Sequence, residues 1–293
     1  MEKFEGSMVA IVTPFKKGRI DEKAFAGLVN WHIEQGTHAI IPCGTTGESA
    51  TLEYEEHYRV IELAVKAAKR RVPVIAGTGA NSTDETIMMT KKARSLGADA
   101  ALLVCPYYNK PTQKGIYLHY KAVADAVKGF PLILYNVPGR TALNILPETV
   151  ARLAEVKNIV GIKEATGDMK QASELIRICG DGFTVLSGDD FTNLPLYALG
   201  GKGCISVTAN IAPRLEAEMW EAWRSGDHQR AAKLHYQLEP LNKAMFLETN
   251  PIPVKTALAM MGKIKEEFRL PLCGMGEENK KKLKKTLAAG KLI

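Results

Sequence analysis

The sequence lacks a run of about 18 consecutive apolar residues, the length that a helix needs to cross a membrane, so we expect no membrane span. The first apolar run, MVAIVTP at residues 8–14, is too short for a signal peptide and follows acidic residues. Only 5 cysteines occur among 293 residues. Their spacing matches no zinc site, and their odd number argues against a closed disulfide framework. We therefore expect a soluble protein of a reducing, cytoplasmic compartment.

Acidic residues are slightly outnumbered, because 39 Lys and Arg against 32 Asp and Glu give a net charge of +7. Much of the basic excess lies in one run, KKKLKK at residues 280–285. Aromatic side chains, which nucleic-acid-binding surfaces use to stack on bases, do not interleave these lysines. We interpret the run as the solvated face of a helix and predict no nucleic-acid partner.

The chain does contain eight short apolar runs rich in Val, Ile and Leu. They occupy residues 8–14, 39–44, 73–79, 100–106, 132–138, 159–165, 184–190 and 204–210. Longer segments with helical period lie between them; in 55–70, for example, Tyr58, Ile61 and Val65 recur at spacings of three and four. Strands that are apolar on both faces and separated by helices indicate a parallel sheet. Eight such units predict a TIM (β/α)8 barrel.

A doubly wound α/β sheet is the alternative fold. Its glycine-rich fingerprint is missing after the first run, where VTPFKKGR contains one Gly. After residue 211 the segments look helical, and Asn250 before Pro251 suits a helix start. We predict an α/β protein with a (β/α)8 barrel over residues 1–224 and a C-terminal helical appendage over residues 225–293.

Polar residues gather where the predicted strands end, which in a barrel is the face that carries the active site. They are GTTGES at 44–49, PYYN at 106–109, Tyr135, Asn136, Arg140, Lys163, SGDD at 187–190, Ser206, Thr208 and Asn210. Each has an ordinary structural explanation. Gly and Thr suit a tight turn, paired tyrosines pack at a rim, aspartates cap helices, and a strand-end lysine extends its amine to water. No carboxylate spacing suggests a metal site.

Together, these residues favour chemistry that depends on one amine. A lysine in a water-poor barrel mouth has a lowered pKa, and a neutral amine attacks a ketone or aldehyde to form a Schiff base. Lys163 is the candidate, and hydroxyl groups on neighbouring strands could form a proton shuttle: Tyr135, Thr46 and Tyr108. The imine is itself an electron sink, so no cofactor is expected.

Two further groups point to substrates that carry carboxylates. Arg140 offers a forked pair of donors that matches a carboxylate. Thr45 and Thr46, with their backbone N–H groups, can hold a second carboxylate near a helix N-terminus. The sequence therefore predicts a Schiff-base aldolase for carboxylated substrates.

Seven motifs carry a resemblance to a known family: GTTGES, PYYNKP, YNVPGRT, GIKEATGD, LSGDD, ISVTAN and NPIPVK. From about Gly6 to the C-terminal helices, the chain resembles the dihydrodipicolinate synthase / N-acetylneuraminate lyase family. YNVPGRT and GIKEATGD, in that order, look like its dihydrodipicolinate synthase branch. The resemblance implies condensation of pyruvate with L-aspartate-4-semialdehyde to 4-hydroxy-tetrahydrodipicolinate, at the start of the route to diaminopimelate and lysine.

The resemblance also implies roles for individual residues. Lys163 would form the imine with pyruvate in place of a cofactor, and Tyr135 would donate and accept protons above it. Thr46 would link Tyr135 to Tyr108, which would come from the neighbouring subunit of a tight dimer. The implied substrate-binding positions are Thr45, Thr46, Arg140, Gly188 and Ile205. Thr45 and the backbone of Thr46 would hold the pyruvate carboxylate and Arg140 that of the semialdehyde. The family usually forms a tetramer, a dimer of dimers.

Members that are inhibited by L-lysine bind it at the tight dimer interface through a recurring set of residues. The positions that match here are Ser49, Ala50, His57, Asn81, Glu85 and Tyr107. Tyr54 stands where enteric members have His, and a phenol can still form a hydrogen bond. The resemblance implies inhibition by lysine; the alternative is an interface without a ligand.

Three other functions compete with this interpretation. An N-acetylneuraminate or 2-keto-3-deoxy-sugar-acid lyase would share Lys163 and Tyr135, but a sugar tail needs hydroxyl partners in place of Arg140. A phosphate-binding barrel isomerase would need glycine-rich anion loops after the seventh and eighth strands, whereas SGDD is acidic. A non-catalytic basic binding protein would depend on the C-terminal lysines.

Overall fold

The computed structural model describes residues 4–293, which form two compact units. We call Pro73–Ile205, together with Phe4 and Glu5, the central unit. Gly6–Val72 and Ser206–Ile293 form the flanking unit.

The central unit is built on six parallel strands, hydrogen-bonded in the order β10-β9-β8-β7-β6-β5. Their bounds are β5 (Ile75–Gly77), β6 (Ala100–Val104), β7 (Leu132–Asn136), β8 (Ile159–Glu164), β9 (Thr184–Ser187) and β10 (Gly203–Ser206), whose last residue belongs to the flanking unit. Leu103, Ile133 and Ile162 are fully buried, as expected for parallel strands that are covered on both faces.

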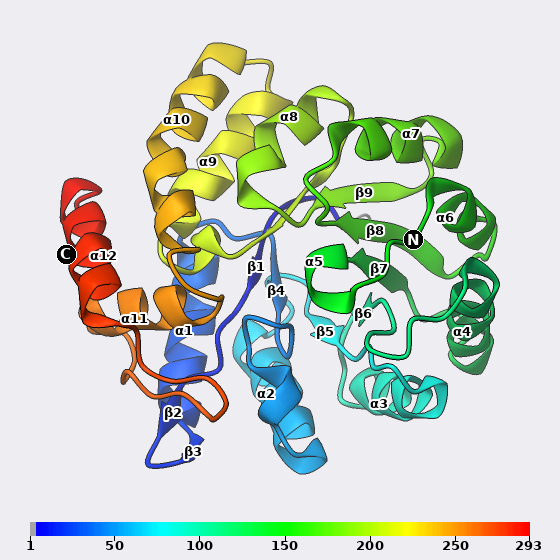
Figure 1. Cartoon of the computed structure of the whole chain (residues 1–293), viewed down its shortest axis with the longest axis horizontal. Coiled ribbons are helices and arrows are strands. Elements are labelled where there is room, and N and C mark those ends of the chain that lie inside the picture. The colour runs from blue at the N-terminus through cyan, green and yellow to red at the C-terminus, as the bar shows by residue number, and fades with distance from the viewer. Residues whose placement is uncertain (1–3) are drawn as a thin grey trace. The chain divides into compact units, whose positions relative to one another are not determined.

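The helices and 3-10 turn of the central unit are α3 (Thr83–Ser95), α4 (Gln113–Ala126), α5 (Pro138–Thr141), α6 (Pro147–Ala154), α7 (Met169–Cys179), η2 (Asp190–Thr192) and α8 (Asn193–Ala198). Helices α3, α4, α6 and α7 lie on the outer side of these strands, whereas the four-residue α5 lies close to the end of β7 (Figure 1). Three of these helices have an N-cap side chain that accepts a hydrogen bond from a backbone N–H of the first turn: Ser82 in α3, Thr112 in α4 and Asp168 in α7. These caps give each helix a fixed start after its strand.

The flanking unit contains the parallel pair β1 (Gly6–Ala10) and β4 (Ala39–Ile41), and a hairpin of β2 (Phe15–Lys16) and β3 (Arg19–Ile20). Its helices and 3-10 turns are α1 (Glu22–Glu34), η1 (Ser49–Thr51), α2 (Tyr54–Ala68), η3 (Thr208–Asn210), α9 (Pro213–Arg224), α10 (His228–Ala244), α11 (Ile252–Met260) and α12 (Glu277–Ala289). Helices α9 and α10 lie side by side (Figure 1).

The two units together supply eight strands with parallel partners, and a helix follows each one along the chain. The fold is a (β/α)8 barrel with a C-terminal helical region, which confirms the predicted fold class. The two compact units meet along the chain at residues 72/73 and 205/206, among the strands of the barrel. The domain boundary that we predicted between residues 224 and 225 stays a prediction.

Helix α11 begins at Ile252 with Pro251 as its N-cap residue, so its start lies one residue later than the N-cap predicted at Asn250. The side-chain amide of Asn250 instead donates a hydrogen bond to Thr46 Oγ1 at 3.0 Å.

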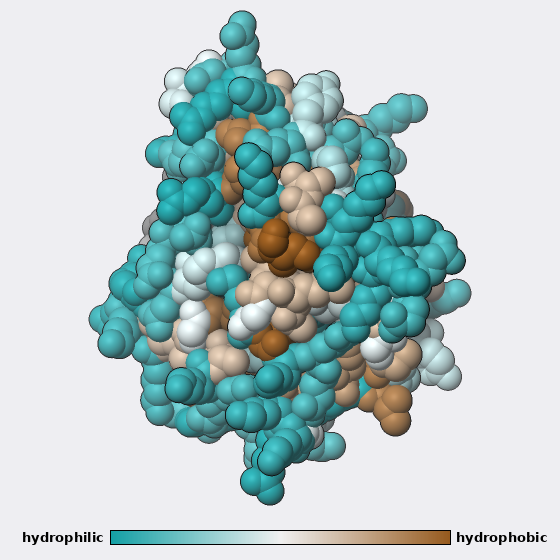
Figure 2. Space-filling view, turned by 90° about the vertical axis from the view of Figure 1, so that its left-hand side faces the viewer, coloured by the Kyte–Doolittle hydropathy of each residue, from teal (hydrophilic) through white to brown (hydrophobic). Residues whose placement is uncertain are grey.

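The C-terminal lysine run lies on α12, and its interpretation as a solvated face is confirmed. Leu283 and Leu287 are fully buried, whereas Lys281 and Lys284 are exposed. Figure 2 shows the side of the molecule on which α12 lies in Figure 1, and this face is predominantly hydrophilic. Within residues 4–293, no helix has the length and the apolar character that crossing a membrane requires.

Candidate active site

Lys163 and Tyr135 lie side by side on neighbouring strands. Strands β7 and β8 pair in parallel, and their register places Tyr135 opposite Lys163. The Lys163 Nζ lies 4.4 Å from the centroid of the Tyr135 ring, within the range of a cation–π contact. Only 5% of Lys163 and 8% of Tyr135 is exposed. The lysine is therefore largely buried, with its amine next to the tyrosine ring.

Gly188 leaves the space that Lys163 occupies. A Cβ at this position would lie 2.8 Å from Lys163 Cε and 2.7 Å from the Cβ of Ala165, closer than such atoms approach. The backbone N–H of Gly188 donates to the carbonyl of Glu164 at 2.7 Å, which fixes the glycine beside β8. Ile205, on β10, is 1% exposed and belongs to the same unit. Gly188, predicted as a pocket residue, thus contacts the candidate nucleophile.

Arg140 lies on α5, the four-residue helix that follows β7. Its backbone N–H donates to the carbonyl of Val137 at 2.9 Å, and Thr141 Oγ1 donates to the same carbonyl at 3.2 Å. Arg140 is exposed and stands only five residues after Tyr135 along the chain. Strand β7 and the connection after it therefore carry both a buried tyrosine and an exposed arginine.

Tyr108 does not join Lys163 and Tyr135 within this chain, because 89% of its surface is exposed. Its backbone has φ +71°, a left-handed conformation that costs a non-glycine residue energy.

The preceding residue, Tyr107, comes together with two other predicted lysine-binding residues. Burial raises the pKa of the Tyr107 phenol, the nearby Glu85 carboxylate raises it further, and a hydrogen bond with the backbone of Asn81 opposes the shift. The three residues form one polar cluster at the start of α3, with a carboxylate that could meet an ammonium group.

In the flanking unit, Thr45 and Thr46 lie in a tight loop after β4. The N–H of Gly47 donates to the carbonyl of Gly44, and the N–H of Glu48 donates to that of Thr45, each at 3.1 Å. Thr46 is 2% exposed and accepts its hydrogen bond from Asn250. The loop is therefore held both by its own turns and by the chain just before α11.

An ion pair that the sequence analysis missed lies directly behind this loop. Glu48 and Lys255 form it with both side chains fully buried, and Glu48 Oε2 also accepts from the N–H of Arg269 at 3.1 Å. The Lys255 Nζ lies 4.3 Å from the ring centroid of Phe15 and 5.1 Å from that of Phe268. Burial lowers the pKa of Lys255, and the Glu48 carboxylate opposes that shift. The sequence signal that could have indicated this pair was a charged residue, Lys255, at the end of the apolar motif NPIPVK.

The other predicted lysine-binding residues occupy one short stretch of the flanking unit. Ser49 and Ala50 open η1, and Tyr54 and His57 lie on the first turns of α2. Tyr54 is 44% exposed and stacks on Tyr58, with ring centroids 6.4 Å apart, whereas His57 is buried. The phenol that replaces the enteric His is thus accessible to a ligand.

Two asparagines that we predicted at the active-site face make structural contacts instead. Asn136 points its side chain to the opposite side of β7 from Tyr135, because alternate residues of a strand face opposite ways. Asn210 accepts from the N–H of Val12 at 3.1 Å and donates to the carbonyl of Ala10 at 2.8 Å. Strand alternation was the signal that could have separated Asn136 from the site.

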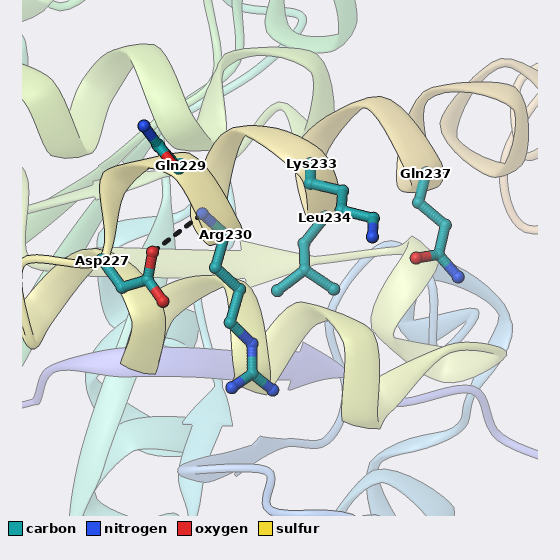
Figure 3. A pocket seen from close by; sticks show the side chains of 6 residues that line it. All are labelled: Asp227, Gln229, Arg230, Lys233, Leu234 and Gln237. Carbon is teal, nitrogen blue, oxygen red and sulfur yellow. Dashed lines mark hydrogen bonds between the residues drawn. The ribbon is translucent and has the colours of Figure 1, made fainter.

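A hollow of about 520 Å³ lies along α10 (Figure 3) and is lined by five exposed polar side chains and by the buried Leu234. Two of its charged groups already have partners: Asp227 accepts from the N–H of Arg230, and the Arg230 guanidinium pairs with Glu218, each at 3.0 Å. Elsewhere in residues 4–293, no three His, Cys, Asp or Glu residues cluster as metal ligands would.

The chain is similar in sequence to proteins of one activity. It matches the model of the Dihydrodipicolinate synthetase family over residues 3–290. A curated relative, the 4-hydroxy-tetrahydrodipicolinate synthase of Thermodesulfovibrio yellowstonii, is 74% identical over 290 residues, which cover 99% of each chain.

Two solved structures are similar over nearly the whole chain. The chloride-inhibited dihydrodipicolinate synthase of Acinetobacter baumannii, complexed with pyruvate, is 52% identical with a TM-score of 0.97, covering 99% of this chain and 100% of that one. A DHDPS from Cyanidioschyzon merolae with lysine bound is 40% identical with a TM-score of 0.96, covering 99% of each chain.

Proposed function

Because the chain belongs to the dihydrodipicolinate synthetase family, we propose that it is a lyase that condenses pyruvate with L-aspartate-4-semialdehyde to give 4-hydroxy-tetrahydrodipicolinate. The observation that carries this proposal is the buried Lys163 amine, held 4.4 Å from the centroid of the Tyr135 ring. A buried amine beside a proton-transfer group is what imine formation with a keto acid requires.

In the first step, Lys163 Nζ bonds to the keto carbon of pyruvate, and the carbonyl oxygen leaves as water after protonation. Loss of a methyl proton then gives an enamine, whose carbon bonds to the aldehyde carbon of the semialdehyde. The aldehyde oxygen takes up a proton. Finally, the amino group of the second substrate attacks the imine carbon, which closes the ring and releases the amine of Lys163. The imine supplies the electron sink, so the reaction as proposed uses no cofactor.

We assign proton transfer to Tyr135, with Thr46 and Tyr108 as the other members of a hydroxyl chain. The exposure of Tyr108 supports an origin for this phenol in the neighbouring subunit, since an exposed ring is available to a second copy. We further propose that the protein forms a homotetramer, built as a dimer of dimers. We propose the cytoplasm as its location.

Carboxylate binding falls to three residues. Thr45 and the backbone of Thr46 would hold the pyruvate carboxylate, and Arg140 would hold that of the semialdehyde through its forked donors. Gly188 and Ile205 would line the pocket. The rigid turns of the threonine loop and the exposure of Arg140 support these assignments.

We also propose that L-lysine inhibits the enzyme. Asn81, Glu85 and Tyr107, together with the accessible Tyr54, provide acceptors for an ammonium and donors for a carboxylate. The lysine-bound relative supports this assignment.

Borohydride trapping tests the chemistry. With pyruvate and borohydride, the wild type should gain a stable adduct on the peptide that contains Lys163, as read by mass mapping. Lys163→Ala should keep its fold and lose both adduct and turnover, whereas Lys170→Ala, which removes an exposed lysine of the same unit, should keep both. An active enzyme without label at Lys163 contradicts the proposal.

The acceptor needs a separate measurement. We expect turnover with the semialdehyde and none with N-acetylneuraminate, and Arg140→Ala should raise the KM for the semialdehyde with little change in the KM for pyruvate. Turnover of N-acetylneuraminate would favour the sugar-acid lyase instead.

A further inference from the structure

Glu164, the residue after Lys163, is a buried carboxylate on the opposite side of β8. It is 4% exposed, and neutral groups donate its hydrogen bonds. Asn136 Nδ2 and Gln171 Nε2 donate to Oε2 at 3.0 and 3.1 Å, and the N–H of Thr166 donates to Oε1 at 2.8 Å. All three contacts are donors, so both oxygens of Glu164 act as acceptors and its buried polar atoms are satisfied.

The bond between Glu164 and Asn136 lies directly behind the candidate catalytic pair. The register of β7 and β8 places Asn136 opposite Glu164, one step after Tyr135 opposite Lys163. Since successive side chains of a strand point to opposite faces, one pair faces the chemistry and the other faces away from it. A shift between the two strands would move both pairs together.

The same network reaches the segment that follows Arg140. Asn136 Nδ2 donates to Asn144 Oδ1 at 2.7 Å, and Asn136 Oδ1 accepts from the N–H of Ile145 at 3.0 Å. Asn144 and Gln171 exchange two hydrogen bonds, at 2.8 and 3.1 Å, through their side-chain amides. The far end of the Arg140 connection is thereby tied to β7, to β8 and to α7.

We propose that Glu164 and Asn136, with Asn144 and Gln171, form a positioning network for the Schiff-base chemistry. It holds the register that keeps the Lys163 amine over the Tyr135 ring, and it anchors the connection that carries Arg140. This inference rests on the proposed function, because it assigns a purpose to the network only if Lys163 forms the imine.

The donor and acceptor pattern makes single substitutions informative. Glu164→Gln replaces one acceptor oxygen with an NH2 group, which then faces another donor. Asn136→Asp places a second carboxylate against Glu164. Because displacement of a reacting group by about 1 Å can cost about 100-fold in rate, we expect each variant to lose about 10- to 100-fold in kcat.

The double variant Asn136→Asp/Glu164→Gln restores the pattern. The new amide at position 164 can accept from the N–H of Thr166 and donate to the new carboxylate at position 136, which still accepts from the N–H of Ile145. The side-chain amides of Asn144 and Gln171 only need to turn over, so that each donor again meets an acceptor. The buried charge moves to the neighbouring strand while the hydrogen bonds are kept.

The test compares the wild type, both single variants and the double variant. The measurements are kcat, the KM for pyruvate, and the rate of borohydride trapping at Lys163 under saturating pyruvate, with circular dichroism as the check on folding. Glu174→Gln is the matched control, because it removes an exposed carboxylate of α7 in the same unit. We expect the folded single variants to lose kcat and trapping rate, and the double variant to recover most of both.

Single variants that are folded and as fast as the wild type overturn the inference, as does a folded double variant no faster than the single ones. If a single variant does not fold, the double variant decides alone: trapping at the wild-type rate supports the network, and slow trapping refutes it. A merely structural role would lower the melting temperature without changing the trapping rate of the folded protein. Failure of the proposed function is distinct, because the wild type itself would then give no adduct at Lys163.

Discussion

Replacing Lys255 with Met should destabilise the protein more than replacing any exposed lysine. Lys255 and Glu48 form a fully buried ion pair, and Glu48 is the second residue after Thr46. Met has a similar length, so the substitution removes the charge while largely preserving the packing of the side chain.

The magnitude follows from the carboxylate that stays behind. Glu48 would keep its hydrogen bond from the N–H of Arg269 but lose its only buried cation partner among the residues described here. Breaking a buried pair by removing one partner costs about 3–5 kcal/mol, because an uncompensated charge stays in the interior. In contrast, Lys243→Met removes an exposed pair with Glu239, which is worth about 0.3–0.5 kcal/mol.

Urea unfolding at pH 7 and fixed protein concentration measures these differences. The double variant Lys255→Met/Glu48→Gln should recover most of the loss, because the amide that replaces the carboxylate is neutral and its oxygen can still accept from the N–H of Arg269. The rate of pyruvate trapping should fall in the single variant, since Glu48 anchors the loop of Thr45 and Thr46.

If Lys255→Met lowers the free energy of unfolding by less than about 1 kcal/mol, this reasoning is refuted, because exposed ion pairs contribute that little. A double variant as unstable as the single one would refute it too. The instability would then come from lost packing against Phe15 and Phe268, and not from a charge without a partner.

Three further outcomes are expected. Gly188→Ala should slow pyruvate trapping by at least about tenfold, because its Cβ would displace Lys163, whereas Gly182→Ala, in open space, should not. Burial lowers the pKa of His119 to about 4. As the pH falls, histidine in the unfolded chain takes up its proton before His119 in the folded protein does, so the stability present above about pH 6.5 is lost towards pH 4. In His119→Asn, the urea concentration at the unfolding midpoint should therefore change less between pH 6.5 and pH 4. Glu85→Gln should weaken inhibition in an activity assay with added L-lysine and leave kcat without lysine unchanged; undiminished inhibition would exclude this carboxylate from the site.

The sequence by itself determined the fold class and the candidate nucleophile. Eight apolar runs separated by helical segments have few solutions other than a parallel barrel, because each strand must be covered on both faces. Lys163 stood out because a charge directly after VGI is unusual in a buried strand. Both signals are local, so they can be read from neighbouring residues alone.

Tertiary structure decided which polar residues face the chemistry and which support it. Asn136 stood beside Tyr135 in the sequence, yet the pleat of β7 turns it away to bind Glu164. Glu48 and Lys255 are 207 positions apart, and no local pattern indicates that they pair. Hydrogen bonds and ion pairs between distant segments depend on where the folded chain brings them, and only the three-dimensional arrangement determines that.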